Sequence, residues 1–207
     1  MPSNNQLFTS VTAEHNTPTD LIHAAHAVLG GIDCDPATNV EAQSYIAAKH
    51  FYVDPVADTS ASVNGLTAPW PGETVWLNPP FTVPKRDQAG NVVKNNKGVI
   101  IRSRVIEQWV HRWVVEMAKR TDAPAQYSNR AGGLLLVPAR VDTQWFKPLW
   151  AFPMCFIEGR LHFSNADQGA TFPTVVIYAG KHVLRFNTIF ENFGTCGVFS
   201  DLLSYHQ

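Results

Sequence analysis

Four consecutive residues, Asn78-Pro79-Pro80-Phe81, place a carboxamide, two rigid imino acids and an aromatic ring directly after the apolar residues 75–77. The two prolines end a strand abruptly, because proline has no N–H to donate to a ladder and its φ is fixed. The asparagine oxygen accepts a hydrogen bond from an amino group, and the Pro79 carbonyl is a second acceptor. With Phe81 as a flat surface beside them, these groups form a receptor for a planar molecule with an exocyclic amine, such as adenine.

Such a receptor favours methyl transfer to the amine. The lone pair of the adenine amine is delocalised into the ring, and two acceptors that hold its N–H bonds return electron density to nitrogen. A methyl sulfonium placed opposite could then be attacked in line, with positioning and electrostatics supplying most of the acceleration. Within a duplex the base must be flipped out and stacked, here on Phe81. The alternative interpretation of the four residues is a strand terminator whose asparagine bonds to local backbone.

The composition predicts a folded protein with an unevenly placed charge. The chain has 207 residues, of which 45% are hydrophobic and 16% charged, enough for one substantial domain or two small ones. The net charge of −1 excludes a chain that is basic throughout. Residues 85–104 nevertheless carry six basic residues against one acidic residue, which suits a DNA-contact loop and equally a solvated surface loop. The basic residues are Lys85, Arg86, Lys94, Lys97, Arg102 and Arg104.

Other features of the sequence limit the cellular compartment and the cofactors that are expected. Cys34, Cys155 and Cys196 are odd in number and lack metal-type spacing, which predicts a reduced, cytoplasmic environment and no metal site. The first residues have no charged region followed by an apolar one, so no signal peptide is expected. No apolar run approaches the length that spans a membrane, and no membrane partner is expected.

The chain reads as helices alternating with strands, followed by more closely spaced strands. Residues 1–15 are expected to be flexible, and Thr17 is expected to cap a helix that runs to Gly30. Further helices are expected at 38–51 and 105–119, and a long loop or small hairpin at 82–103. Strands are expected at 32–36, 75–78, 133–137 and 174–178, with 154–158 and 161–163 as a possible pair. This order predicts a single α/β domain over residues 16–207, with a mostly parallel sheet, helices on both faces and an antiparallel end.

Several segments together resemble the phage-type DNA N6-adenine methyltransferases, over about residues 16–194. The segments are Thr17-Pro18, residues 31–37, Gly65-Leu66 with Pro69-Trp70, residues 75–81, residues 136–146, residues 155–163 and Phe172-Pro173 before the strand at 174–178. The resemblance implies a Rossmann-like methyltransferase fold that uses S-adenosylmethionine and acts on double-stranded DNA with the adenine flipped out. It also implies a role in marking phage or prophage DNA.

The resemblance implies roles for particular residues. Asn78, Pro79, Pro80 and Phe81 form the catalytic motif. The residues expected at the cofactor are Thr17, Pro18, Asp33, Asp35, Pro36 and Asn78, with the two carboxylates near the methionine amine or a ribose hydroxyl. Arg140 and Thr143 join the six basic residues of the 82–104 insert as expected DNA contacts, whereas Arg160 has no assigned role. The glycine-rich loop usual after the first strand of methyltransferases is missing, and Asn64 stands where an acid is often seen.

Alternatives remain at this stage. The same receptor suits methylation of an RNA base or of a glutamine side chain, since each offers a planar nitrogen. A catalytically inactive DNA-binding relative or partner subunit is also open, because the cofactor loop is altered. The DNA recognition sequence, the preferred strandedness or methylation state of the DNA, and the choice between monomer and homodimer are not predicted.

Overall fold

The computed structural model describes residues 16–53, 63–122, 128–162 and 172–199, and the segment 1–15 lies outside them. The helices are α1 (Thr19–Leu29), α2 (Val40–Ile46), α3 (Ile106–Thr121) and α4 (Val183–Phe190), with a short 3-10 helix, η1 (Lys147–Ala151). The strands are β1 (Cys34–Thr38), β2 (His50–Val53), β3 (Thr74–Leu77), β4 (Thr82–Pro84), β5 (Arg102–Arg104), β6 (Gly132–Pro138), β7 (Met154–Ile157), β8 (Thr174–Gly180) and β9 (Gly194–Gly197). None of the helices in these ranges is both long and apolar enough to cross a membrane.

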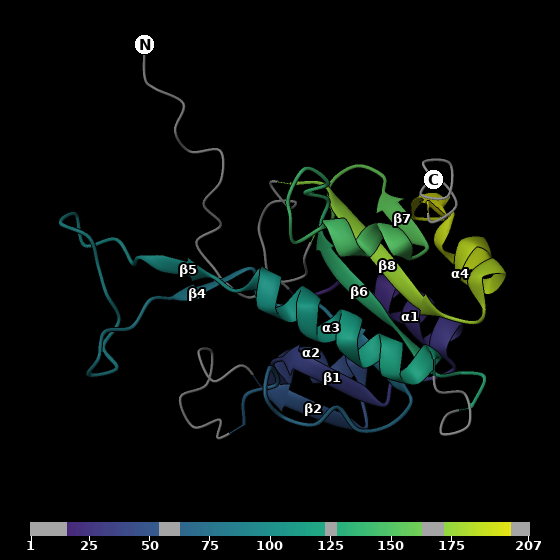
Figure 1. Cartoon of the computed structure of the whole chain (residues 1–207), viewed down its shortest axis with the longest axis horizontal. Coiled ribbons are helices and arrows are strands. Elements are labelled where there is room, and N and C mark those ends of the chain that lie inside the picture. The colour runs from purple at the N-terminus through teal and green to yellow at the C-terminus, as the bar shows by residue number, and fades with distance from the viewer. Residues whose placement is uncertain (1–15, 54–62, 123–127, 163–171, 200–207) are drawn as a thin grey trace, which may run out of the picture.

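Within the described residues, seven strands form one sheet in the order β2-β1-β3-β6-β8-β7-β9 (Figure 1). The strands β2, β1, β3 and β6 pair in parallel. Strand β8 is antiparallel to both β6 and β7, and β9 is antiparallel to β7. The prediction of an α/β fold with a mostly parallel sheet and an antiparallel end is confirmed.

Helices cover both faces of this sheet, and the alternation of side chains along each strand explains why. In β3, Trp76 packs with the buried residues of α1, α2 and α4, whereas Val75 and Leu77 pack with those of α3 and η1. All four residues of β3 are buried. A strand that is apolar on both sides must be covered on both sides, and this places β3 in the middle of the protein.

The amino-terminal helix begins differently from the prediction. Its C-terminal end is as expected, with Gly30 in the left-handed conformation at φ 69°. At its start, however, Pro18 is the flanking residue and no side chain caps the helix. Thr17 is therefore not the N-cap, because its hydroxyl accepts a hydrogen bond from the Asn78 side chain instead.

The helix predicted at 38–51 is much shorter, because the second half of that segment is a strand. Helix α2 ends at Ile46, and the left-handed Ala47 (φ 51°) turns the chain. Residues His50–Val53 form β2, an edge strand parallel to β1. Strand β1 also runs through Pro36 instead of breaking there, since its register with β2 shifts between Asp35 and Thr38 and tolerates a residue without an N–H.

The carboxyl-terminal region holds elements that the sequence did not predict. Strand β7 pairs with β8 and β9 and not with residues 161–162, while residue 163 lies outside the described ranges. The tail contributes α4, whose Phe186 and Phe190 are fully buried, and β9. The β7–β9 pairing sets Cys155 opposite Cys196, and both thiols are free.

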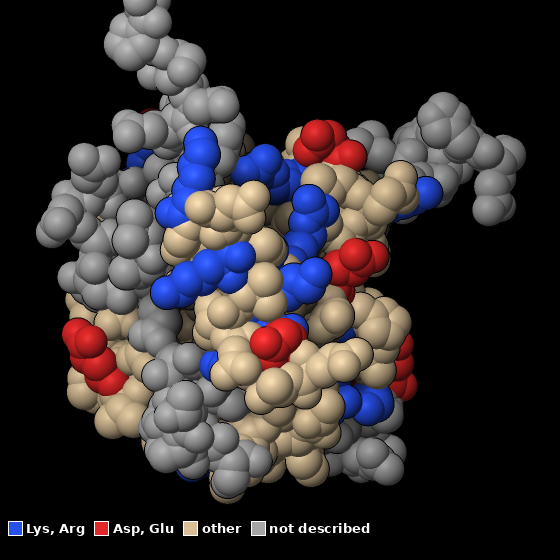
Figure 2. All heavy atoms as spheres, turned by 90° about the vertical axis from the view of Figure 1, so that its left-hand side faces the viewer, with Lys and Arg blue, Asp and Glu red and all other residues tan. Residues whose placement is uncertain are grey.

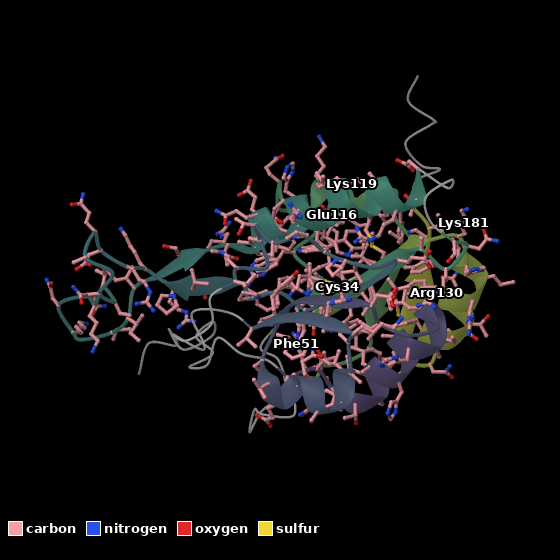
Figure 3. All side chains as sticks on the ribbon, turned by 90° about the horizontal axis from the view of Figure 1, so that it is seen from below. Cys34, Phe51, Glu116, Lys119, Arg130 and Lys181 are labelled. Carbon is pink, nitrogen blue, oxygen red and sulfur yellow. The ribbon has the colours of Figure 1, made fainter. Side chains whose placement is uncertain are left out.

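A buried ion cluster ties the loop at residues 63–73 to α3 (Figure 3). The Glu116 carboxylate accepts from Arg120 at 2.8 Å and from Lys119 at 2.8 Å, and it lies 3.1 Å from Arg112. The Arg120 side chain is 1% exposed and also donates to the Trp70 carbonyl at 2.6 Å. The loop is thereby held against the face of the sheet that α3 covers.

Replacing Glu116 by Gln should lower the free energy of unfolding by about 3 kcal/mol, because it leaves the buried Arg120 guanidinium without its counter-charge. Chemical denaturation of the purified protein measures this quantity. The matched change Glu107→Gln, at an exposed position of the same helix, should alter it by less than about 0.5 kcal/mol. Equal effects of the two substitutions would contradict the structural role of the cluster.

Candidate active site

Asn78 lies at the carboxyl end of β3, where the ends of the parallel strands β1 and β6 also lie. The two prolines after it stop the strand at this edge, and Asn78 is half-buried whereas Pro79 is buried. In open α/β sheets, ligands bind outside the carboxyl ends of the strands. The Asn78 carboxamide is therefore placed at the edge where a ligand would be expected, and not in the interior of the protein.

The Asn78 side chain is held by Thr17, which precedes α1. The Asn78 amide nitrogen donates to the Thr17 hydroxyl at 3.0 Å, although the residues are 61 positions apart. Thr17 is 2% exposed, so this end of the carboxamide points into the protein. The same carboxamide also carries an oxygen, which is a hydrogen-bond acceptor.

Two further asparagines anchor the segment that carries Thr17. Asn39 donates to the side-chain oxygen of Asn16 at 2.8 Å, and the Asn39 oxygen caps α2 by accepting from the Ala42 amide at 2.8 Å. Asn16 is 2% exposed. Asn16 and Asn39 were not predicted as site residues. The sequence did signal a helix cap in this region, but the prediction placed the cap at Thr38, whereas the residue that caps α2 is Asn39.

Asp35 lies within β1 and faces the protein, not the edge of the sheet. It is 1% exposed and accepts hydrogen bonds from Gln43 at 2.8 Å and from the Ala37 amide at 3.3 Å. Burial raises the pKa of Asp35 to about 7, against the lowering effect of its hydrogen bonds. Asp35 thus shapes the turn from β1 into α2, and its carboxylate is not presented to a ligand.

Asp33 lies at the other edge of the sheet, before β1 begins. Its carboxylate accepts from the Glu73 and Thr74 amides at 2.9 and 3.2 Å and pairs with Lys49 at 2.7 Å and Arg130 at 3.4 Å. Burial alone would raise the pKa of Asp33, but the hydrogen bonds from Lys49 and the two amides lower it to about 2. This arrangement differs from the predicted cofactor contact, because the carboxylate joins the amino ends of β1, β3 and β6.

Pro36 contacts the loop at residues 63–73 through its backbone. A Cβ added at Gly65 would lie 1.8 Å from the Pro36 carbonyl oxygen, so only glycine fits this approach. The Trp70 indole donates to the Gly65 carbonyl at 2.8 Å and closes the loop. The Gly65 and Trp70 segment of the sequence is therefore packed beside the end of β1, close to the residues expected at the cofactor.

Phe81 joins the motif to the base of a protruding hairpin. Its ring contacts Phe172 edge-to-face with centroids 5.3 Å apart, and its carbonyl accepts from the Val105 amide at 3.1 Å. Phe172 precedes β8, which starts at the same edge of the sheet because it is antiparallel to β6. Phe81 as a whole is half-buried.

Residues 82–104 form an extended hairpin that projects from the body of the protein (Figure 1). Strands β4 and β5 pair antiparallel at its base. Beyond them the backbone closes a three-way ring: the Lys85 amide donates to Ile101, the Ile101 amide to Val93, and the Val93 amide to Lys85, at 2.8, 2.9 and 2.9 Å. Of the two predicted alternatives for residues 82–103, a long loop or a small hairpin, the hairpin is confirmed.

The two tips of this hairpin repeat one another at a spacing of eight residues. In the first tip the Asp87 side chain accepts from the Ala89 and Asn91 amides, and in the second the Asn95 side chain accepts from the Lys97 and Val99 amides. Gly90 and Gly98 hold equivalent left-handed positions, at φ 86° and 75°. The repeat was missed in the sequence, although the Asp/Asn and Gly spacing carries it.

Basic side chains are spread along this hairpin, on the face shown in Figure 2. Lys85, Arg86, Lys94, Lys97 and Arg104 are exposed, whereas Arg102 is half-buried and donates to the Thr82 hydroxyl at 2.9 Å. Arg86 donates to the Gly90 carbonyl within the first tip. The structure thus brings the six predicted DNA contacts onto one projecting element, with Arg102 engaged at its base.

The other predicted DNA contacts follow β6 at the carboxyl edge of the sheet. Arg140 is exposed, and its carbonyl accepts from the Thr143 amide at 3.0 Å and from the Thr143 hydroxyl at 2.7 Å. Thr143 therefore closes a local turn. Arg160 is exposed just beyond β7, which ends at the same edge.

Replacing Asp35 by Asn should remove a pH dependence of stability between about pH 4 and 7. The folded-state pKa of Asp35 is about 7, above its ordinary value of 3.8, so the neutral carboxyl stabilises the fold fully below pH 4. That stabilisation is lost as the pH rises through 7, and Asn has no proton to lose. The melting temperature of the variant, relative to that of the wild type, should therefore rise from pH 4 to 7. If the difference between the two melting temperatures is constant across this range, the burial of a neutral Asp35 carboxyl is contradicted.

No protein-family model matches this chain, and a comparison with curated proteins gives no significant match. The function must therefore be argued from the residues at the carboxyl edge of the sheet.

Proposed function

We propose that this protein transfers a methyl group from S-adenosylmethionine to the N6 amine of an adenine flipped out of DNA. One observation carries the proposal: at the carboxyl edge of the sheet, the amide nitrogen of Asn78, three residues before Phe81, donates to the hydroxyl of the buried Thr17. The same carboxamide has an acceptor oxygen, and an acceptor followed closely in the chain by an aromatic residue suits an adenine amine.

The residues at the carboxyl edge of the sheet would have different roles in the reaction. The Asn78 oxygen and the Pro79 carbonyl would each accept a hydrogen bond from one N–H group of the amine, and Phe81 would stack on the base. The new N6–CH3 bond would form as the S–CH3 bond of the donor breaks, and the surplus N6 proton would pass to water once nitrogen is cationic. No strong base is required, and correct placement of the amine would provide most of the rate acceleration.

The proposed cofactor, which presents hydroxyl, amino and carboxylate groups, would lie beside Asn78. Thr17, Pro18 and the end of β1 at Pro36 would hold it, with Gly65 allowing the close approach of loop and strand. S-adenosylmethionine, when bound, supplies the activated methyl group. Asp35 would act through the shape of the β1–α2 turn, since its carboxylate faces Gln43. Asp33 is not part of the proposed cofactor site.

The basic hairpin supports nucleic acid as the acceptor. Its net charge of +5 on a chain of net charge −1 is the distribution expected of a local phosphate-binding element. A glutamine side chain or an RNA base would offer a similar planar nitrogen, and the hairpin favours a nucleic acid over a protein substrate. Arg140 would contact a phosphate flanking the flipped base.

Replacing Asn78 by Ala should reduce kcat for methylation of duplex DNA by at least about 100-fold, because it removes one of the two acceptors that act in the transition state. Transfer of labelled methyl groups to DNA measures this rate. Cofactor binding and the melting temperature should stay close to wild-type values.

The matched control is Asn129→Ala, an exposed asparagine before β6 at the opposite edge of the sheet, which should leave kcat unchanged. Wild-type activity in the Asn78→Ala protein would refute the proposed mechanism. Methyl transfer to RNA or to protein, but not to DNA, would refute the proposed acceptor.

Replacing both Lys94 and Lys97 by Gln should weaken DNA binding and make it less sensitive to salt. Each phosphate contact that is lost should reduce the slope of log Kd against log salt by about 1. Titrations of a labelled duplex at several salt concentrations measure the slope, and kcat at saturating DNA should stay near the wild-type value.

The control with the same change in charge is Lys119→Gln with Lys181→Gln. These lysines lie on α3 and before α4, on the body of the protein and away from the hairpin (Figure 3). If this pair of substitutions changes the salt slope as much as the hairpin pair does, the hairpin is not the DNA-contact element.

A further inference from the structure

We propose that Thr17 is a positioning residue, whose hydroxyl holds the Asn78 carboxamide in the plane needed to grip the substrate amine. This inference rests on the proposed function and goes beyond it, because it assigns Thr17 to the catalytic asparagine and not only to the cofactor. Its basis is the 3.0 Å hydrogen bond from the Asn78 amide nitrogen to the Thr17 hydroxyl.

The local sequence makes this hydrogen bond unexpected. Thr17 followed by Pro18 is the usual arrangement of a helix cap and a first helical residue. In the structure α1 starts at Thr19, no side chain caps it, and Asp20 accepts from the Leu21 amide next to it. The Thr17 hydroxyl therefore does not cap the helix, and α1 lacks the stabilisation that a side-chain cap would give.

Thr17 itself is fixed on both sides. On one side the Pro18 carbonyl accepts from the Ile22 amide at 3.2 Å and begins α1. On the other, the Asn16 side chain is bound by Asn39, the cap of α2. The residue whose hydroxyl binds Asn78 therefore lies between the starts of two helices, and it is 2% exposed.

The chemical consequence concerns rotation of the Asn78 side chain. The hydrogen bond to the Thr17 hydroxyl fixes the plane of the Asn78 carboxamide. A hydroxyl can donate as well as accept, so it could bind either the nitrogen or the oxygen of the carboxamide. The substrate amine is a donor and therefore favours the orientation in which the carboxamide oxygen faces it. Without the hydroxyl, the Asn78 amide nitrogen would lose its hydrogen bond to Thr17, and the carboxamide would be held less firmly in its plane. The fraction of encounters in which the acceptor oxygen meets the amine in line with the donor methyl group would fall.

Thr17→Val, which replaces the hydroxyl by a methyl group of similar size, tests the proposal. We expect kcat at saturating cofactor and DNA to fall about tenfold, as for the loss of one hydrogen bond. Because Thr17 also belongs to the proposed cofactor site, kcat is compared at saturating S-adenosylmethionine, where a change in the Kd for the cofactor does not enter. The KM for DNA should change by less than about twofold. Thr17→Ser keeps the hydroxyl and should retain kcat within about threefold.

Two controls separate positioning from folding and from cofactor binding. Thr19→Val makes the same chemical change at an exposed residue nearby and should leave kcat unchanged. In the Asn78→Ala background, Thr17→Val should have no further effect on kcat, because there is no carboxamide left to position.

Three results would overturn the proposal: wild-type kcat in Thr17→Val, a loss of cofactor affinity with kcat preserved at saturation, or equal losses in Thr17→Ser and Thr17→Val. The serine comparison decides the matter even where the valine variant folds poorly. A wild-type protein that transfers no methyl group to DNA would instead refute the proposed function.

Discussion

The central strand β3 is the constraint on which the rest of the site depends. It pairs with β1 on one side and β6 on the other, and its four residues are buried under helices on both faces. Pro79 and Pro80 prevent the strand from extending, so Asn78 has one possible position, at the carboxyl edge of the sheet. Every other feature of the candidate site is placed relative to that residue: Thr17 on its inner side, the end of β1 next to it, and the hairpin that starts at Phe81.

The elements that were predicted correctly are those whose local pattern agrees with their packing. Helix α3 has an apolar stripe that includes Trp109, Trp113 and Met117, and strands β6 and β8 are continuous buried runs. The segment at 38–51 was predicted wrongly, because its helical pattern ends at the left-handed Ala47 and the residues after it gain their hydrogen bonds from β1. Propensity does not indicate where such tertiary pairing begins.

The site was predictable in its motif and not in its supporting contacts. Asn78 to Phe81 follow a strand, and the rule for open sheets places them at a ligand-binding edge. Asp33 and Asp35 are two residues apart and read equally well as ligands, but one precedes β1 and the other is within it. Their contacts then diverge: Lys49 and backbone amides keep Asp33 ionised, whereas burial favours the neutral form of Asp35. The bond between Thr17 and Asn78 spans 61 residues, and no local pattern signals it.

Under the proposed function, substrate binding and chemistry would occupy one segment of the chain, residues 78–104, without competing. Its base is joined to the site, since the Phe81 carbonyl accepts from the Val105 amide. Its tips are built from local turns at Asp87 and Asn95, stiffened by the three-way ring at residues 85, 93 and 101, and make no use of Asn78. A basic tip that binds a phosphate would therefore orient the DNA through the base of the hairpin toward Phe81. Side chains on the tips can vary in charge and shape without altering the carboxamide, so under the proposed function the affinity for DNA and the rate of methyl transfer would be separable.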